Sequence, residues 1–377
     1  GSIEEVSKRC SKESGGKYTI TPEFLPTDAS QQREQLVRRL GAEDPSIDIV
    51  GMDVIWTGEF ANAGWVEEWT GPLKKQVTEN VFPNVIETAS FEGKLYAAPF
   101  NTNTQLLWYR KDLVKQPPKT WDEMIDMAEG LKEAGSIQVQ ANRYEGYMVF
   151  ANALIESAGT EILSGPEEVD LEEGPTEKAL EVIGRLANGG AAPPSLSTSD
   201  EDSARLAFEA GESAFMTNYT FAFASAQTEA PEIGKVMGYA RFPRVDASKP
   251  SRPPLGGFNL AVSAFSENQD VAFEAAACLA NDVSQKTAVE LDGLPPSRSD
   301  LYSDKAVTKA YPGFAQLVKE SIEGSGPRPT TPAYQDVSLA VQRALHPPDK
   351  VDPEDTEPTF DELKENVEDA VKREGLL

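Results

Sequence analysis

Short strand-like runs alternate with helical segments in the first third of this chain, and that alternation restricts its fold more than any other sequence feature. Residues 30–40 have the apolar spacing of an amphipathic helix and begin with Ser30, a residue type that caps helix N-termini. The apolar run at 47–52 is strand-like, and 58–63 begins another helix. Alternation of this kind is typical of α/β proteins and predicts largely parallel sheets.

Other segments extend this pattern along the chain. Residues 3–14 are spaced as an amphipathic helix, and Thr120 with Glu123 three residues later has the spacing of a capping box for a helix at 121–134. Further strands are predicted at 18–24, 95–99, 104–109, 213–217 and 258–262. Further helices are predicted at 149–158, 175–187, 203–210 and 268–281, and helices dominate the remainder.

The length of 377 residues suits two domains of roughly 150 to 200 residues each. The chain carries 35 basic and 62 acidic residues, a net charge of -27. Such a field repels nucleic-acid backbones and anionic lipids, so neither is an expected partner. No apolar run reaches the roughly 18 to 20 residues that span a bilayer.

Two cysteines and one histidine limit the chemistry that the chain can perform. Cys10 and Cys278 lack the short spacing of a metal-binding or redox pair, which leaves two buried free thiols or one long-range disulfide. The disulfide suits an exported protein. His346 is the single histidine, so a conventional zinc site and most histidine-dependent catalysis are excluded. We expect no metal and no cofactor.

Aromatic residues stand beside polar residues at several predicted strand ends. A pyranose packs its apolar C–H face on an aromatic ring, while its hydroxyls need hydrogen-bond donors and acceptors. Asp53 directly follows the strand at 47–52, where open α/β sheets place their ligand crevice. An aspartate there can instead cap a helix, and an aromatic residue can instead belong to the core. The pairs are Asp53 with Trp56, Asn103 with Trp108, Asn218 with Tyr219, and Tyr144 with Glu145.

A series of runs, taken in order, resembles the sugar-binding proteins of the maltose-binding type. The runs are 48–50 with Trp56, 60–65, 93–99, 107–113, 117–123, 208–215, 256–262 and 293–296. The resemblance implies an α/β fold of the two-lobe periplasmic-binding-protein type, with the ligand cleft between lobes that hinge segments join. It also implies a non-enzymatic, monomeric protein that closes on a small sugar and delivers it to the membrane subunits of an ABC importer.

Within that family, the runs at 103–109, 255–257 and 328–332 and both cysteine contexts are similar to mycobacterial trehalose-binding lipoproteins. The resemblance therefore implies a disaccharide ligand, with trehalose first, and an extracellular or cell-envelope location. A lipid anchor and a strand with a polar loop are expected ahead of the first helix and are absent from this sequence.

The resemblance also assigns the ligand site. It implies that Asp53 and Asn103 hold sugar hydroxyls from the first lobe. Arg328 and the backbone near Gly257 are expected to reach in from the hinge and the second lobe. Tyr219 stands where the resembled proteins have Trp. The remaining expected ligand-binding residues are Gln32, Arg33, Trp56, Tyr144 and Glu145.

The expected lobes are discontinuous in sequence. The first lobe comprises 1–107 and 257–297, and the second comprises 112–253 and 302–377. Hinge crossings are expected near 108–111, 254–256 and 298–301. This division puts both cysteines in helices of the first lobe, which favours the disulfide.

Three alternatives compete with this interpretation. A glycosidase with Asp53 and Glu145 as its carboxylate pair is one. A structural or adhesion protein is another, and it would need a broad apolar face. A binding protein for a monosaccharide, a longer glucan or a non-sugar osmolyte is the third.

Overall fold

A computed structural model describes residues 1–26 and 28–372, and the contacts of the chain divide it into two units. Unit 1 comprises Gly1–Asn103, Leu255–Lys319 and Thr330–Tyr334. Unit 2 comprises Thr104–Pro254, Glu320–Pro329 and Gln335–Leu377. The chain therefore passes repeatedly from one unit to the other. Residues 27 and 373–377, which the expected lobes include, lie outside the described residues.

The two units differ from the expected lobes at residues 302–319 and 330–334, which belong to unit 1, and at residues 104–107, which belong to unit 2. Two interactions hold the segment 302–319 in unit 1. The Tyr311 hydroxyl donates to the Gly293 carbonyl at 2.6 Å, and the Lys286 ammonium lies 3.5 Å from a carboxylate oxygen of Asp304. The passage that was expected near 298–301 therefore falls at 319/320, and the chain crosses between the units again at 329/330 and 334/335.

The sheet of unit 1 is built around a strand from the middle of the chain. β9 (Pro254–Val262) pairs along one edge with β1 (Ile49–Asp53) and along the other with β4 (Ala97–Asn103). Both pairings are antiparallel. β2 (Ser90–Phe91) and β3 (Lys94–Leu95) form a separate antiparallel pair. β9 thus begins 151 residues after the end of β4 and 201 residues after the end of β1.

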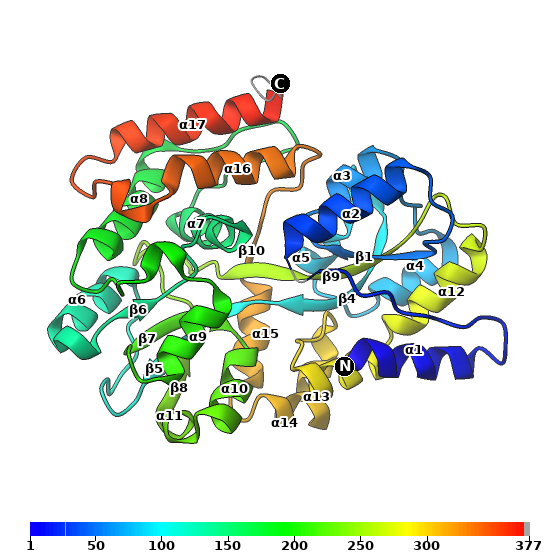
Figure 1. Cartoon of the computed structure of the whole chain (residues 1–377), viewed down its shortest axis with the longest axis horizontal. Coiled ribbons are helices and arrows are strands. Elements are labelled where there is room, and N and C mark those ends of the chain that lie inside the picture. Colours follow the sequence, from blue (N-terminus) through cyan, green and yellow to red (C-terminus); the bar gives the residue numbers. More distant parts are fainter. Residues whose placement is uncertain (27, 373–377) are drawn as a thin grey trace. The chain divides into compact units, whose positions relative to one another are not determined.

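Helices surround this sheet, and a disulfide ties one of them in place. Cys10 of α1 and Cys278 of α12 form a disulfide bond, which confirms the expected long-range disulfide over two free thiols. Figure 1 shows α1 beside α13, and α1 packs on both α12 and α13. The helices are α1 (Ser2–Glu13), α2 (Ala29–Gly41), α3 (Thr57–Asn62), α4 (Gly71–Thr78), α5 (Pro83–Thr88), α12 (Gln269–Leu279), α13 (Asp282–Asp292) and α14 (Lys305–Ala310). α15 (Ala315–Glu323) runs from unit 1 into unit 2.

Unit 2 has a four-stranded sheet in the order β6, β7, β5, β8. Its central strand β5 is buried over Leu106, Leu107 and Trp108, as a strand covered on both faces should be. The strands are β5 (Gln105–Arg110), β6 (Ile137–Gln138), β7 (Phe215–Tyr219) and β8 (Met237–Ala240), while β10 (Gly326–Pro327) lies outside this sheet.

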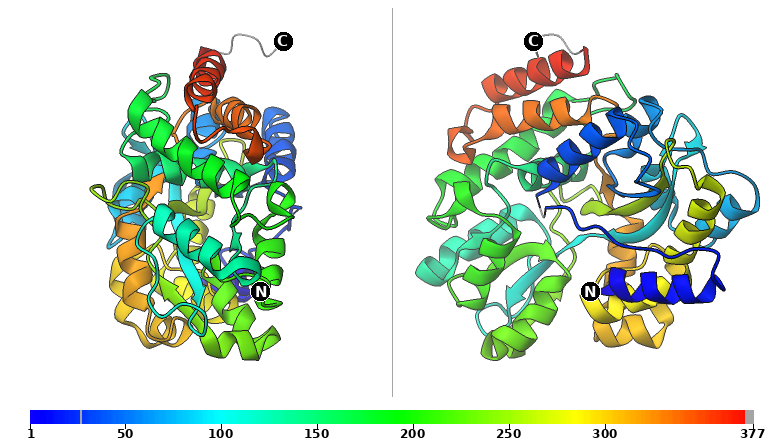
Figure 2. Two further views of the ribbon diagram at one scale, coloured as in Figure 1. Left: turned by 90° about the vertical axis from the view of Figure 1, so that its left-hand side faces the viewer. Right: turned by 45° about the vertical axis from the view of Figure 1, so that its right-hand side comes forward.

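The helices of unit 2 pack through an aromatic core. The Trp121 ring meets the rings of Phe150 and Phe242 edge to face, at centroid distances of 5.5 and 5.6 Å. Figure 2 shows α16 and α17 side by side. The helices are α6 (Trp121–Leu131), α7 (Glu145–Ala158), α8 (Glu173–Asn188), α9 (Glu201–Glu209), α10 (Phe221–Glu229), α11 (Pro231–Val236), α16 (Tyr334–Leu345) and α17 (Glu357–Lys372).

The helix caps agree only in part with those that the sequence predicts. Thr120 Oγ1 accepts from the Glu123 amide at 3.2 Å, as a cap of α6 should. The Glu123 carboxylate, however, accepts from the Lys119 amide and not from that of Thr120. Asp28, not Ser30, caps α2, because its carboxylate accepts from the Gln31 amide at 2.9 Å.

Two predictions about strands are wrong. Residues 18–24 form no strand. The sheets are also not largely parallel: among the strand pairings whose register is described, only that of β6 with β7 is parallel. The rule behind the prediction concerns consecutive strands joined by a helix, whereas β9 arrives from a distant part of the chain and enters between β1 and β4.

Short 3-10 helices also occur at Lys132–Ala134, Leu196–Thr198, Ser299–Ser303 and Pro348–Lys350. Of the helices in the described ranges, none combines the length and the apolar composition needed to span a bilayer.

Candidate functional site

In unit 1, the register of β9 gathers three of the expected ligand-binding residues. Asp53, the last residue of β1, lies opposite Phe258, and the Val54 amide donates to the Gly257 carbonyl at 3.3 Å. On the other edge of β9, Asn103 at the end of β4 lies opposite Gly256. Asp53, Asn103 and Gly257 therefore share one end of the sheet.

Gly257 makes this close approach of strands possible. Its φ is 136°, a backbone conformation that other residues rarely adopt. A Cβ at this position would lie 2.8 Å from the Cα of Thr102 and closer still to the Asn101 carbonyl oxygen. Glycine is therefore required here by the neighbouring strand as well as by its own backbone.

The carboxylate of Asp53 has a local hydrogen-bond partner. Its Oδ1 accepts from the Ile55 amide at 3.3 Å, which fixes the turn after β1. The residue is half-buried. Phe258, directly across from it, is 41% exposed. This aromatic ring was not among the expected site residues, although the alternation of β9 could have indicated it.

Two other expected residues of unit 1, Trp56 and Arg33, contact side chains of the same unit. The Trp56 ring is buried and stacks on Phe60 at a centroid distance of 6.0 Å. The Arg33 guanidinium binds both carboxylate oxygens of Glu59, at 2.7 and 2.5 Å, and so joins α2 to α3. Gln32 is half-buried on α2 beside Arg33. Glu59 was missed, because nothing local marks it as the partner of Arg33.

In unit 2, the N-terminus of α7 is the centre of a polar cluster. Tyr144 is its N-cap residue and Glu145 its first residue, where the helix dipole favours a carboxylate. The Tyr144 hydroxyl donates to a Glu201 carboxylate oxygen at 2.6 Å. Burial raises the pKa of Glu201, and burial together with the Glu201 charge raises the pKa of Tyr144. The tyrosine therefore stays a neutral donor.

Tyr219 belongs to the same cluster. It is the last residue of β7, and its amide donates to the Asn218 side-chain oxygen at 2.8 Å. The Asn218 side-chain amide in turn donates to the Glu201 carbonyl at 2.9 Å. The charge of an ionised Tyr219 would raise the pKa of Tyr144 further. The rings of Tyr144 and Tyr219 and the carboxylate of Glu201 thus belong to one cluster.

Arg328 adds a charged pair to this cluster. Its Nη1 donates to Oε1 of Glu145 at 2.6 Å, and the Ser338 hydroxyl donates to Oε2 at 2.7 Å. The Gln342 side chain then donates to the Ser338 hydroxyl at 3.0 Å. The side chain of Arg328 is 5% exposed. Neither Glu201 nor Ser338 was anticipated, because only the fold brings them to α7.

The expected site residues therefore form two groups, one in each unit. Tyr144, Glu145, Tyr219 and Arg328 are in unit 2, and the others are in unit 1. The carboxylates of Asp53 and Glu145, the hypothetical glycosidase pair, belong to different units, and Glu145 is engaged by Arg328. Within residues 1–26 and 28–372, no cluster of three or more acidic, histidine or cysteine side chains could hold a metal ion.

Comparison with known proteins gives consistent matches over most of the chain. Residues 8–316 match the family described as bacterial extracellular solute-binding proteins. A probable ABC transporter-binding protein of Deinococcus radiodurans is 30% identical over 340 residues, which cover 85% of this chain and 80% of that protein. A galactooligosaccharide-binding protein of Bacillus subtilis is 24% identical over 345 residues, covering 87% of this chain and 78% of that protein.

Solved structures have the same fold. A maltose-bound protein of T. maritima superimposes with a TM-score of 0.85 at 24% identity, covering 100% of this chain and 96% of that one. An acarbose-binding receptor of Streptomyces glaucescens gives a TM-score of 0.82 at 19% identity, covering 99% and 94%.

Proposed function

Because this chain belongs to the family of bacterial extracellular solute-binding proteins, we propose that it is the substrate-binding component of an ABC importer and that its ligand is a sugar. The finer proposal is a disaccharide, with trehalose as the first candidate. Relatives whose names denote a galactooligosaccharide-binding protein and a maltose-bound protein support a carbohydrate ligand.

The observation that carries the proposal is the cluster around the N-terminus of α7. Tyr144 and Tyr219 offer aromatic faces, while Glu145, Glu201 and Arg328 offer charged hydrogen-bonding groups. Sugars are bound by this combination, because the ring C–H groups pack on aromatic faces and the hydroxyls bond to charged groups. Asp53, Asn103 and Phe258 provide a similar mixture in unit 1.

The proposal includes the behaviour of the protein in transport. Ligand is expected to favour a closed state of the two units through its higher affinity for that state. The importer's membrane subunits would then receive the sugar from the closed form. A cell-envelope location and a lipid anchor are part of the same proposal.

A thermal-shift screen with calorimetric follow-up tests the ligand. The panel is trehalose, maltose, sucrose, glucose and maltotriose, with mannitol as an osmolyte. A carrier affinity in the micromolar range corresponds to about -8 kcal/mol, and a ligand at about 100 times its dissociation constant adds about 2.7 kcal/mol of stability. A shift with trehalose alone supports the finer proposal. A shift with mannitol alone, or with no member of the panel, argues against a sugar ligand.

Small-angle scattering with and without the best ligand tests closure, which is expected to lower the radius of gyration. Incubation of each disaccharide with the protein, followed by chromatography, tests the enzymatic alternative. Release of monosaccharides would overturn the proposal of a binding protein.

A further inference from the structure

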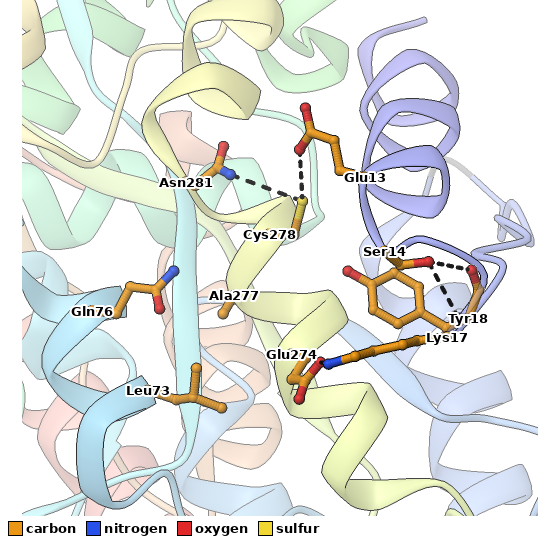
Figure 3. A pocket seen from close by; sticks show the side chains of 10 residues that line it. All are labelled: Glu13, Ser14, Lys17, Tyr18, Leu73, Gln76, Glu274, Ala277, Cys278 and Asn281. Carbon is orange, nitrogen blue, oxygen red and sulfur yellow. Dashed lines mark hydrogen bonds and ion pairs between the residues drawn. The ribbon is translucent and has the colours of Figure 1, made fainter.

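The two sulfur atoms of the disulfide lie in different surroundings. Cys10 of α1 is fully buried, whereas Cys278 of α12 is half-buried and lines a cavity of about 370 Å³. Figure 3 shows the Cys278 sulfur between Glu13 and Asn281, with Gln76, Lys17 and Tyr18 around the same cavity. A small molecule in this cavity can therefore contact the sulfur of Cys278, whereas that of Cys10 is inaccessible.

The charges around the two sulfurs differ in the same sense. The Arg9 guanidinium approaches the Cys10 sulfur at 3.4 Å through Nη2. The sulfur of Cys278 instead has the Glu13 carboxylate at 3.9 Å, and the neutral side-chain amide of Asn281 donates to it at 3.9 Å. A cation stabilises a neighbouring thiolate, and an anion destabilises it. If the bond breaks, the negative charge is therefore stabilised on Cys10 and disfavoured on Cys278.

Access and charge together determine the direction of exchange. A thiolate attacks the sulfur that it can reach, and the sulfur whose thiolate is more stable leaves faster. Glu13 would repel an incoming thiolate, but its carboxylate is itself bound to Arg9 Nη1 at 2.7 Å, which offsets part of its charge. Lys17, paired with Glu274 at 3.1 Å, adds a cation at the cavity.

We propose that Cys278 is the electrophilic end of an exchangeable disulfide and that the adjoining cavity admits small-molecule thiols. The thiolate of the small molecule forms a bond to Cys278 Sγ, the bond between the two cysteines breaks, and Cys10 leaves as a thiolate beside Arg9. A second thiolate then attacks the sulfur of the bound small molecule. It releases the small-molecule disulfide and leaves Cys278 as a thiolate, so two thiols supply the two electrons.

Noncovalent contacts keep the cysteines close during this exchange. Arg9 Nη2 also donates to Ser284 Oγ at 2.6 Å and to Asn281 Oδ1 at 3.1 Å. The Ser2 amide donates to an Asp292 carboxylate oxygen at 2.8 Å. These bonds hold α1 on α13 without the disulfide, so the exchange is reversible and the original bond can form again.

The first test locates the adduct. The folded, oxidised protein is treated with glutathione, quenched with acid, alkylated and digested, and the cysteine peptides are identified by mass spectrometry. We expect glutathione on Cys278 and the alkyl group on Cys10, with at least about ten-fold preference. Equal labelling, glutathione on Cys10, or no exchange without denaturant would overturn the proposal.

The second test examines the charge at Cys10. Arg9→Gln is expected to slow exchange about three-fold, because leaving-group stability affects such rates by roughly this factor per unit of thiol acidity. Arg9→Lys, which keeps the charge, is expected to restore most of the rate, and Arg38→Gln on α2 is the control. A rate for Arg9→Gln equal to or above that of the wild type would contradict the role given to Arg9.

Discussion

Arg328 and Glu145 are 183 positions apart in the sequence, and yet Arg328 Nη1 lies 2.6 Å from Glu145 Oε1. The pair joins the segment 320–329 to the first turn of α7, and the Ser338 hydroxyl binds the second carboxylate oxygen. The ion pair therefore links two segments of unit 2 that are distant in the sequence.

Replacing Glu145 by Ala is expected to lower the free energy of unfolding by about 3 kcal/mol, because it removes the acceptor of a guanidinium that has little access to water. Urea unfolding, followed by tryptophan fluorescence, measures the change. Glu133→Ala, an exposed glutamate of the same unit, should stay within about 0.5 kcal/mol of the wild type. A similar loss in both variants would contradict a specific role for the pair.

The stability of the protein is expected to fall as pH rises because of Glu156. Burial, with a smaller contribution from Glu161, raises its pKa to about 8 from an unfolded value of 4.5, while Arg252 opposes the shift. Between these values the folded state holds more protons than the unfolded state, so the free energy of unfolding decreases with pH. The decrease is fully developed above the folded pKa.

The variant Glu156→Gln tests this pH dependence. It should gain stability relative to the wild type by at most about 1.4 kcal/mol per pH unit from pH 5 to pH 8. Glu167→Gln is an exposed control on the following loop. A difference between Glu156→Gln and the wild type that does not change with pH would show that Glu156 titrates normally.

Replacing Gly257 by Ala is expected to cost at least about 2 kcal/mol of folding stability, because the new Cβ would collide with the backbone of β4 and the φ is unfavourable. Gly51→Ala in β1 is the matched control, since its Cβ would meet nothing within 4 Å. Thermal unfolding of both variants measures the cost. Equal melting temperatures would show that β4 and β9 can move apart.

Asp53→Ala is expected to weaken binding of the sugar found by the thermal screen by about 2 to 4 kcal/mol, because a buried sugar hydroxyl would lose its acceptor. Isothermal calorimetry measures the loss. Asp270→Ala, an exposed aspartate of unit 1, should bind as the wild type does. Unchanged affinity in Asp53→Ala would remove this carboxylate from the ligand site.

The sequence predicts individual elements better than their pairing. The helices at α6 and α8 and the strands β1 and β5 occur close to their expected positions, because apolar spacing and caps are local properties. The antiparallel sheet of unit 1 was not predicted. The strand pairing depends on residues 254–262 entering between β1 and β4, and no local sequence pattern predicts that position.

The candidate site shows the same division between local and distant information. Asp53 and Tyr144 could be named from the sequence because each stands beside an aromatic or charged neighbour at an element end. Glu59, Glu201 and Ser338 could not be named, since their partners are determined by packing. The aromatic ring of Trp56 was expected to meet the ligand, and in the structure it stacks on Phe60, so its binding role stays a prediction.

The central position of β9 has a consequence for synthesis of the protein. A nascent chain that ends before residue 254 contains β1 and β4 but lacks the strand that pairs with both, so their edges stay open. The four-stranded sheet of unit 2 lies within 105–240 and can form earlier. Pairing between distant segments is slow. The sheet of unit 1 is therefore completed after the sheet of unit 2, although its strand β1 is synthesised first.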